Sequence, residues 1–222
     1  MRPLLLLLLL IFTSGCTTTA RITNTPVDEA IPIKRTAINS GQQNAENALF
    51  FMSFSGGGTR AAALTYGVLE ELRDTTFVFD GQEKRLLDEV DSISSVSGGS
   101  FTAAYYALYG DRIFEDYEEV FLRRNVQKTL IGSVLNPVNW LRMAFTKLNR
   151  TELAINYYDR HIFHGSTFAD IEARDGPYVE INATDLGIGE RFTFSQRSFN
   201  MLCSDRSNFS VARAVAASSA VP

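Results

Sequence analysis

A serine flanked by small residues is the position in this chain best suited to nucleophilic chemistry. It is Ser97, within Ser95-Val96-Ser97-Gly98-Gly99. A nucleophilic serine is commonly exposed on a sharp, strained turn between a strand and a helix. Such a turn needs small residues two places before and two places after the nucleophile, and Ser95 and Gly99 fill these places. None of the nearby serines has small residues at both places, and these serines are Ser94, Ser95 and Ser100.

The residues after Ser97 favour the same chemistry. A helix that begins at about Gly98 directs the positive end of its dipole at Ser97, which favours an alkoxide and a developing oxyanion. The alternative interpretation is an ordinary helix N-cap rich in serine and glycine.

A second glycine-rich turn precedes the serine by about forty residues. Gly56-Gly57-Gly58-Thr59-Arg60 follows an apolar run, and consecutive glycines allow several backbone N–H groups to point at one anion. The turn therefore suits an oxyanion hole or a phosphate cradle. It is not a Walker loop, because no Gly-Lys-Ser/Thr follows, and it is not a dinucleotide fingerprint, because Ala61 stands where the third glycine would be.

The surrounding pattern predicts a mixed α/β domain that positions both turns. The apolar run 49–54 suggests a strand buried on both faces, and Ala61, Leu64, Val68 and Leu72 suggest an amphipathic helix after it. A second strand is expected over 90–96, followed by a helix that Gly110 closes. Alternation over 179–184 and 192–195 predicts a hairpin, and a capped helix is expected from Ser210.

The two turns together resemble the patatin-like and cytosolic phospholipase A2 family. The stretches 53–62 and 94–100 resemble its first two motifs, and 182–186 and 216–222 resemble two further segments. The resemblance implies a three-layer α/β/α domain with a mostly parallel sheet. It also implies a lipid acyl-ester hydrolase in which Ser97 attacks the ester, Gly56, Gly57 and Gly58 form the oxyanion hole, and Arg60 positions the loop or a phosphate.

The resemblance further implies a Ser-Asp dyad without histidine, a metal or a cofactor. The dyad aspartate is expected after the segment that ends at Pro222, so the patatin-like domain over 48–222 is expected to be C-terminally truncated and nearly inactive as it stands. Asp80, Asp175 and Asp185 are the candidate substitutes within the chain, and Asp185 fits a turn role better. His161 and His164 are expected to be structural.

The N-terminus reads as an export signal. Leu4 to Phe12 form an apolar run too short for a spanning helix, which needs about 20 residues. Thr13-Ser14-Gly15-Cys16 resembles a bacterial lipobox, although Thr13 stands where leucine is usual. We therefore expect a signal peptide over 1–15, lipidation of Cys16, a flexible tether over 16–47 and an outer-membrane location. A plain cleaved signal and a short anchor remain alternatives.

Residues 121–150 form a basic segment in an acidic chain. The segment has six cationic residues and no Asp or Glu, whereas the chain has a formal net charge of −4. Asn136-Pro137 predicts a helix start, and Trp140, Leu141, Ala144, Phe145 and Leu148 form one stripe. This helix either lies in a lipid interface or packs on the core with a solvated basic face.

The chain as a whole limits the choice of function. Its net charge gives no support for bulk nucleic-acid binding. The favoured function is hydrolysis of a phospholipid or another acyl-ester lipid. The alternatives are an inactive, membrane-anchored lipid-binding or scaffold lipoprotein and, last, a phosphate- or nucleotide-binding domain.

Overall fold

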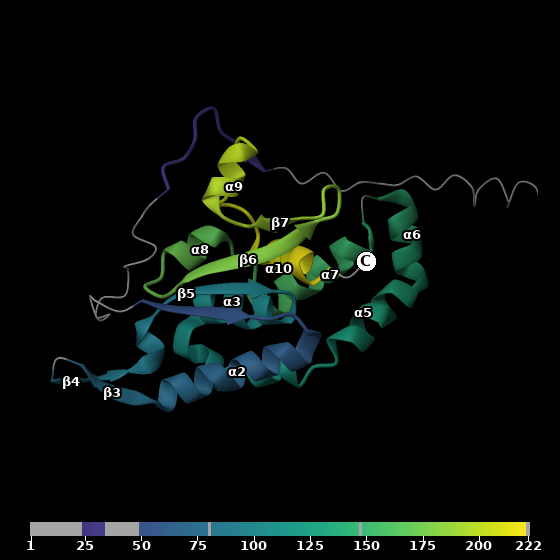
Figure 1. Cartoon of the computed structure of the whole chain (residues 1–222). Coiled ribbons are helices and arrows are strands. Elements are labelled where there is room, and N and C mark those ends of the chain that lie inside the picture. The colour runs from purple at the N-terminus through teal and green to yellow at the C-terminus, as the bar shows by residue number, and fades with distance from the viewer. Residues whose placement is uncertain (1–23, 34–48, 80, 147, 221–222) are drawn as a thin grey trace, which may run out of the picture.

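A four-stranded sheet forms the centre of the computed structural model, which describes residues 24–33, 49–79, 81–146 and 148–220. Its strand order is β2-β5-β6-β7 (Figure 1). The strands β2 (Phe50–Phe54), β5 (Val90–Val96) and β6 (Tyr178–Asp185) are parallel, and β7 (Glu190–Thr193) is antiparallel to β6. The expected α/β class with a mostly parallel sheet is therefore confirmed.

The remaining elements surround this sheet. The helices are α2 (Gly58–Asp74), α3 (Gly98–Tyr109), α4 (Ile113–Tyr117), α5 (Val126–Leu135), α6 (Pro137–Phe145), α7 (Arg150–Tyr158), α8 (Phe168–Glu172), α9 (Gln196–Met201) and α10 (Val211–Ser219). The short helical turns are η2 (Leu86–Glu89), η3 (Gly110–Arg112), η4 (Glu118–Leu122) and η5 (Asp159–Phe163). The minor strands are β1 (Thr25–Pro26), β3 (Thr76–Phe79), β4 (Gln82–Arg85) and β8 (Ser204–Asp205).

The helix α3 is the centre of the core. It packs against β5 and β6, α2 packs on it, and α10 contacts α3 and β6 (Figure 1). All residues from Gly98 to Leu108 are buried, so α3 is enclosed on every side by other elements. Its bounds agree with the prediction, including the end at Gly110.

The first strand and helix occur where they were predicted, but their buried faces differ. The interpretation of β2 as buried on both faces is wrong, because β2 is the edge strand and Phe51 is 64% exposed. In α2 the predicted stripe is wrong in part, since Leu64 and Val68 are exposed, whereas Ala61 is buried and Leu72 packs partly against the core. The buried face of α2 instead carries Ala61, Ala62, Thr65, Tyr66 and Leu69. Small residues there let α2 approach α3 closely.

Other expectations from the sequence hold. The hairpin of β6 and β7 and the helix α10, capped by Ser210, occur where predicted. The helix α6 begins at Pro137 with Asn136 as its N-cap.

Within the predicted tether, residues 24–33 contact the domain, since β1 pairs with β8 and the amide of Ile31 donates to Asn200 Oδ1 at 3.1 Å.

Several predictions concern residues outside the described ranges. They are the signal peptide over 1–15, Cys16, the rest of the tether, Asp80 and Pro222. Among the helices that are described, none is long and apolar enough to cross a membrane.

The buried face of β5 should dominate stability. Ile93 is completely buried in the central sheet, so Ile93→Ala should reduce the free energy of unfolding by about 2–5 kcal/mol, because it removes buried methyl groups and leaves a cavity. Val78→Ala, at a position 72% exposed, should change it by about 0.5 kcal/mol or less. Urea unfolding measures both values, and equal losses would contradict this description of the core.

Candidate active site

Ser97 occupies a strained turn between β5 and α3. Its backbone has φ 53° and ψ −121°, a conformation that a residue with a side chain rarely adopts and that costs about 1–3 kcal/mol unless neighbouring structure stabilises it. The side chain is half-buried, and in the described part of the chain its hydroxyl forms no hydrogen bond. The hydroxyl is therefore available to a ligand.

The glycine loop lies directly against this serine. A Cβ atom added to Gly56 would be 3.2 Å from Ser97 Cβ and 3.8 Å from Ser97 Oγ. Gly57 and Gly58 have φ values of 139° and 62°, which favour glycine. The structure thus brings together the two turns that the sequence singled out.

The contact between the two turns leaves no space for side chains. A Cβ atom on Gly98 would be 2.1 Å from the carbonyl oxygen of Gly58, and one on Gly99 would be 2.7 Å from Phe54 Cβ. The amide of Gly99 also donates to the carbonyl of Ser55 at 3.2 Å. Glycine at these two positions is required because backbone packs on backbone.

The start of α2 supplies backbone donors beside Ser97. The helix begins at Gly58, and its N-cap, Gly57, provides no side-chain hydrogen bond. The first amides of a helix lack partners within the helix and attract anions. Gly56, Gly57 and Gly58 are exposed, and Gly56 and Gly58 lie against the Ser97 turn.

A buried hydroxyl on α10 supports the strained turn. Ser218 is 8% exposed, and its Oγ accepts a hydrogen bond from the amide of Ser97 at 2.8 Å and donates to the carbonyl of Asn182 at 2.5 Å. Ser100 Oγ lies 2.9 Å from Ser218 Oγ and 3.1 Å from Ser95 Oγ. Because Ser100 has one hydroxyl proton, it can donate to only one of them at a time.

Asn182 connects the same network to β5. Its Nδ2 donates to Ser94 Oγ and to the carbonyl of Ser95, both at 3.0 Å, and its Oδ1 accepts from Thr193 at 2.7 Å. Sequence reasoning assigned no role to Asn182 or Ser218. Both lie in segments that resemble the family, but only the fold brings them to the Ser97 turn.

The hydrogen-bond network also distinguishes Ser97 from the nearby serines Ser94, Ser95 and Ser100. Ser95 is 2% exposed and donates to the carbonyl of Glu180, and Ser100 is fully buried. Ser94 accepts the Asn182 hydrogen bond. Of these four serines, Ser97 alone combines an unbonded hydroxyl with the strained turn.

Comparison with known proteins identifies the family of the chain. The family model described as patatin-like phospholipase matches residues 52–222. The chain belongs to the patatin-like phospholipase family. No curated protein sequence matches the chain.

Two solved structures resemble this patatin-like domain. Human GIVD cytosolic phospholipase A2 in complex with methyl gamma-linolenyl fluorophosphonate and terbium chloride is 18% identical with a TM-score of 0.49, and the match covers 82% of this chain and 32% of that one. A second structure of human GIVD cytosolic phospholipase A2 is 20% identical with a TM-score of 0.41, covering 72% and 24%. The patatin-like chain therefore spans about a third or less of the length of these proteins.

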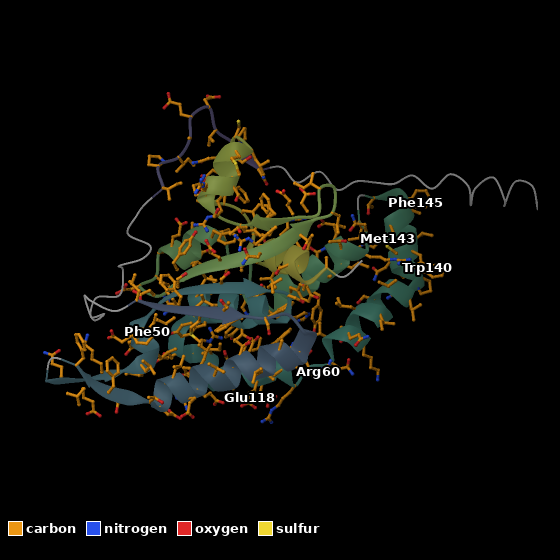
Figure 2. All side chains as sticks on the ribbon, in the orientation of Figure 1. Phe50, Arg60, Glu118, Trp140, Met143 and Phe145 are labelled. Atoms are coloured by element: carbon orange, nitrogen blue, oxygen red, sulfur yellow. The ribbon has the colours of Figure 1, made fainter. Side chains whose placement is uncertain are left out.

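The predicted role of Arg60, which is to position the loop or a phosphate, stays a prediction. Arg60 lies in the first turn of α2 and is exposed (Figure 2). Among the described residues it forms no ion pair or hydrogen bond. Its guanidinium is therefore available, but no contact in this patatin-like domain connects it to Ser97.

Of the candidate substitutes for the dyad aspartate, Asp175 and Asp185 lie in the described structure, and neither forms a hydrogen bond with Ser97 there. Asp185 Oδ1 accepts from the amide of Gly187 at 2.8 Å, which is the turn role expected of it. Asp175 lies in the loop between α8 and β6.

The two histidines lie at η5, and within the described chain neither bonds to Ser97. His161 packs on the Tyr157 ring with centroids 4.7 Å apart. Burial, followed by the charges of Arg124 and Arg160, lowers the pKa of His161. In the described ranges no group of three or more His, Cys, Asp or Glu side chains could hold a metal ion.

Ser218→Ala should weaken the Ser97 turn. The change leaves the amide of Ser97 and the carbonyl of Asn182 without their partner, so we expect a loss of about 1–3 kcal/mol and faster hydrogen exchange at the Ser97 amide. Ser219→Ala is the matched control, because its hydroxyl bonds to the carbonyls of Val215 and Ala216 and to Tyr158, none of which belongs to the Ser97 turn. NMR exchange and urea unfolding measure both effects. An unchanged exchange rate at Ser97 would contradict the role given to Ser218.

Gly98→Ala should disrupt the contact between the two turns. The added methyl group would be 2.1 Å from a backbone oxygen, so we expect a fall in the free energy of unfolding of about 3 kcal/mol or more. Gly67→Ala, in α2 with open space around it, should instead stabilise the domain by up to about 1 kcal/mol. Thermal unfolding compares the two variants, and similar melting temperatures would argue against a close contact at Gly98.

Proposed function

We propose that this domain is a lipid acyl-ester hydrolase of the phospholipase A or lysophospholipase type, with Ser97 as its nucleophile. The observation that carries the proposal is the strained, unbonded serine whose neighbour Gly98 packs on the glycine loop. Membership of the patatin-like phospholipase family supports the reaction class.

The chemistry follows from the arrangement of the two turns. Ser97 Oγ attacks the carbonyl carbon of the ester while its proton passes to a base. The carbonyl oxygen becomes negative and accepts hydrogen bonds from backbone amides of the glycine loop, with Gly57 and Gly58 as the preferred donors. Collapse of the intermediate expels the alcohol, which takes up the proton. Water then attacks the acyl-serine and releases the fatty acid and the free hydroxyl.

The base in this proposal is an aspartate outside the 222 residues. Family resemblance places it in an Asp-Gly-Gly or Asp-Gly-Ala motif. In support, no described carboxylate accepts a hydrogen bond from Ser97. The aspartate would accept the serine proton, return it to the leaving alcohol and later activate the water.

The proposed substrate is a membrane lipid, and the proposed location is a bacterial outer membrane, with Cys16 carrying a lipid anchor. The apolar run and lipobox-like sequence before Cys16 are the support for this part. A catalytically inactive lipid-binding or scaffold lipoprotein is the second candidate. It is favoured by the absence of a carboxylate partner for Ser97 among the described residues.

The test is hydrolysis of a short-chain ester and of a phospholipid, measured on the 222-residue chain and on a chain extended to include the motif aspartate. We expect substantial activity in the extended chain and little in the shorter one. Ser97→Ala should reduce the extended chain's rate by about 1,000-fold or more.

Ser53→Ala is the matched control, because Ser53 is an exposed serine on β2 and its loss should leave the rate unchanged. An extended chain without activity, although folded, would favour the scaffold alternative. Robust Ser97-dependent hydrolysis by the 222-residue chain would leave the nucleophile in place and refute the external aspartate.

A further inference from the structure

The helices α5 and α6 meet at a bend at Asn136, and the bent helix pair that they form (residues 126–145, termed the α5–α6 hairpin) contributes little to the core (Figure 1). Neither helix contains a buried residue. Val126 and Leu130 pack partly against the core and α5 contacts α7, whereas α6 packs chiefly on α5. The expectation that the basic helix packs on the core is therefore wrong for α6.

The hairpin exposes a dense group of large apolar side chains. Each of the following is more than half exposed: Ile131, Leu135, Val138, Trp140, Leu141 and Phe145. Phe145, at 83%, is the most exposed of the large apolar residues in the described chain. Val138, Leu141 and Phe145 follow each other at spacings of three and four, so they share one face of α6. An exposed apolar group of this extent marks an interaction surface.

Polar contacts, not apolar packing, fix the shape of the hairpin. Trp140 Nε1 donates to the carbonyl of Val134 at 2.6 Å, and Asn139 Nδ2 donates to the carbonyl of Ser133 at 2.7 Å. These bonds satisfy the last carbonyl groups of α5, while Asn136 caps α6 through the amide of Val138 at 2.9 Å. The apolar side chains are thus presented on a defined frame.

The charge on this hairpin and its flanks is positive and largely uncompensated. Arg123 forms ion pairs with Glu118 and Glu119. Three other cationic residues, Lys128, Arg142 and Arg150, form no ion pair with any residue that the structure describes. Since residues 121–150 contain no Asp or Glu, the surface is cationic although the chain has a net charge of −4.

The hairpin lies at the same end of the molecule as the candidate nucleophile. Figure 1 shows α5 and α6 on the side where the strand β6 ends, and Figure 2 shows Trp140, Met143 and Phe145 on α6 there. Ser97 follows the parallel strand β5, so it lies at the same edge of the sheet. The turn after β6 adds exposed Leu186 and Ile188, at 78% and 71%.

We propose that the α5–α6 hairpin docks on a bilayer that contains anionic phospholipid, with its apolar side chains in the interface and its cations on the phosphates. Aromatic and aliphatic side chains beside unpaired lysine and arginine are the combination that such surfaces bind. A second copy of the chain fits less well, because two like hairpins would bring positive charges together.

Docking is separate from hydrolysis, and it can be measured without turnover. Ser97→Ala removes the proposed nucleophile but leaves the hairpin unchanged, so failure of one proposal is distinguishable from failure of the other. Cys16→Ser prevents acylation, so any binding that remains does not come from a lipid anchor.

The experiment uses the full chain with both substitutions and the fluorescence of Trp140, the chain's single tryptophan. Vesicles of phosphatidylcholine with phosphatidylglycerol should shift its emission to shorter wavelength, and lipids brominated on their acyl chains should quench it. Pure phosphatidylcholine vesicles should bind at least about tenfold more weakly. No shift and no quenching with the anionic vesicles would overturn the proposal.

Variants assign the effect to the hairpin. Leu141→Ser with Phe145→Ser should reduce vesicle binding about tenfold or more, and Arg142→Gln should reduce it several-fold at low salt. Val78→Ser is the matched control, because Val78 is 72% exposed but lies on β3, away from α6 (Figure 1). If Val78→Ser reduces binding equally, or if Leu141→Ser abolishes a dimer without changing vesicle binding, the bilayer is not the partner.

Discussion

The site depends on one constraint, which is the left-handed backbone of Ser97. A side chain at φ 53° is unfavourable, so the surrounding structure must stabilise the turn. The amide of Ser97 is bonded to Ser218 on α10. Gly98 packs on Gly58 of the glycine loop and Gly99 packs on Phe54 and Ser55, with no room for a methyl group at either position. The sheet, α3 and α10 can thus be understood as the frame that holds one hydroxyl in an otherwise unfavourable position, without a hydrogen bond to any residue that the structure describes.

The sequence was sufficient to locate the two turns because glycine has few alternatives where backbone packs on backbone. The strand–turn–helix order around Ser97 and the hairpin of β6 and β7 followed from local pattern and were confirmed. Ser218 and Asn182 could not be assigned roles, since their partners lie 121 and 87 residues away in sequence. Hydrogen bonds over such distances leave no local pattern.

Burial was harder to predict than secondary structure. Leu64 and Val68 suggested the buried stripe of α2, but the helix turns Ala62, Thr65 and Tyr66 inward because α3 approaches closely. Periodicity identifies the apolar face of a helix, whereas the elements that pack on the helix decide which of its faces is buried. The hairpin of β3 and β4 was also missed, because β4 is Gln-Glu-Lys-Arg and lacks strand-forming residues, although Asp80-Gly81 after the run 76–79 is a turn signal.

The most direct test of the account is a crystal structure of the protein after reaction with a fluorophosphonate. We predict a phosphonyl group on Ser97 Oγ, with its phosphoryl oxygen about 3 Å from the amide nitrogens of Gly57 and Gly58. A phosphonyl group on a different serine, or an oxygen directed into solvent away from the glycine loop, would contradict it.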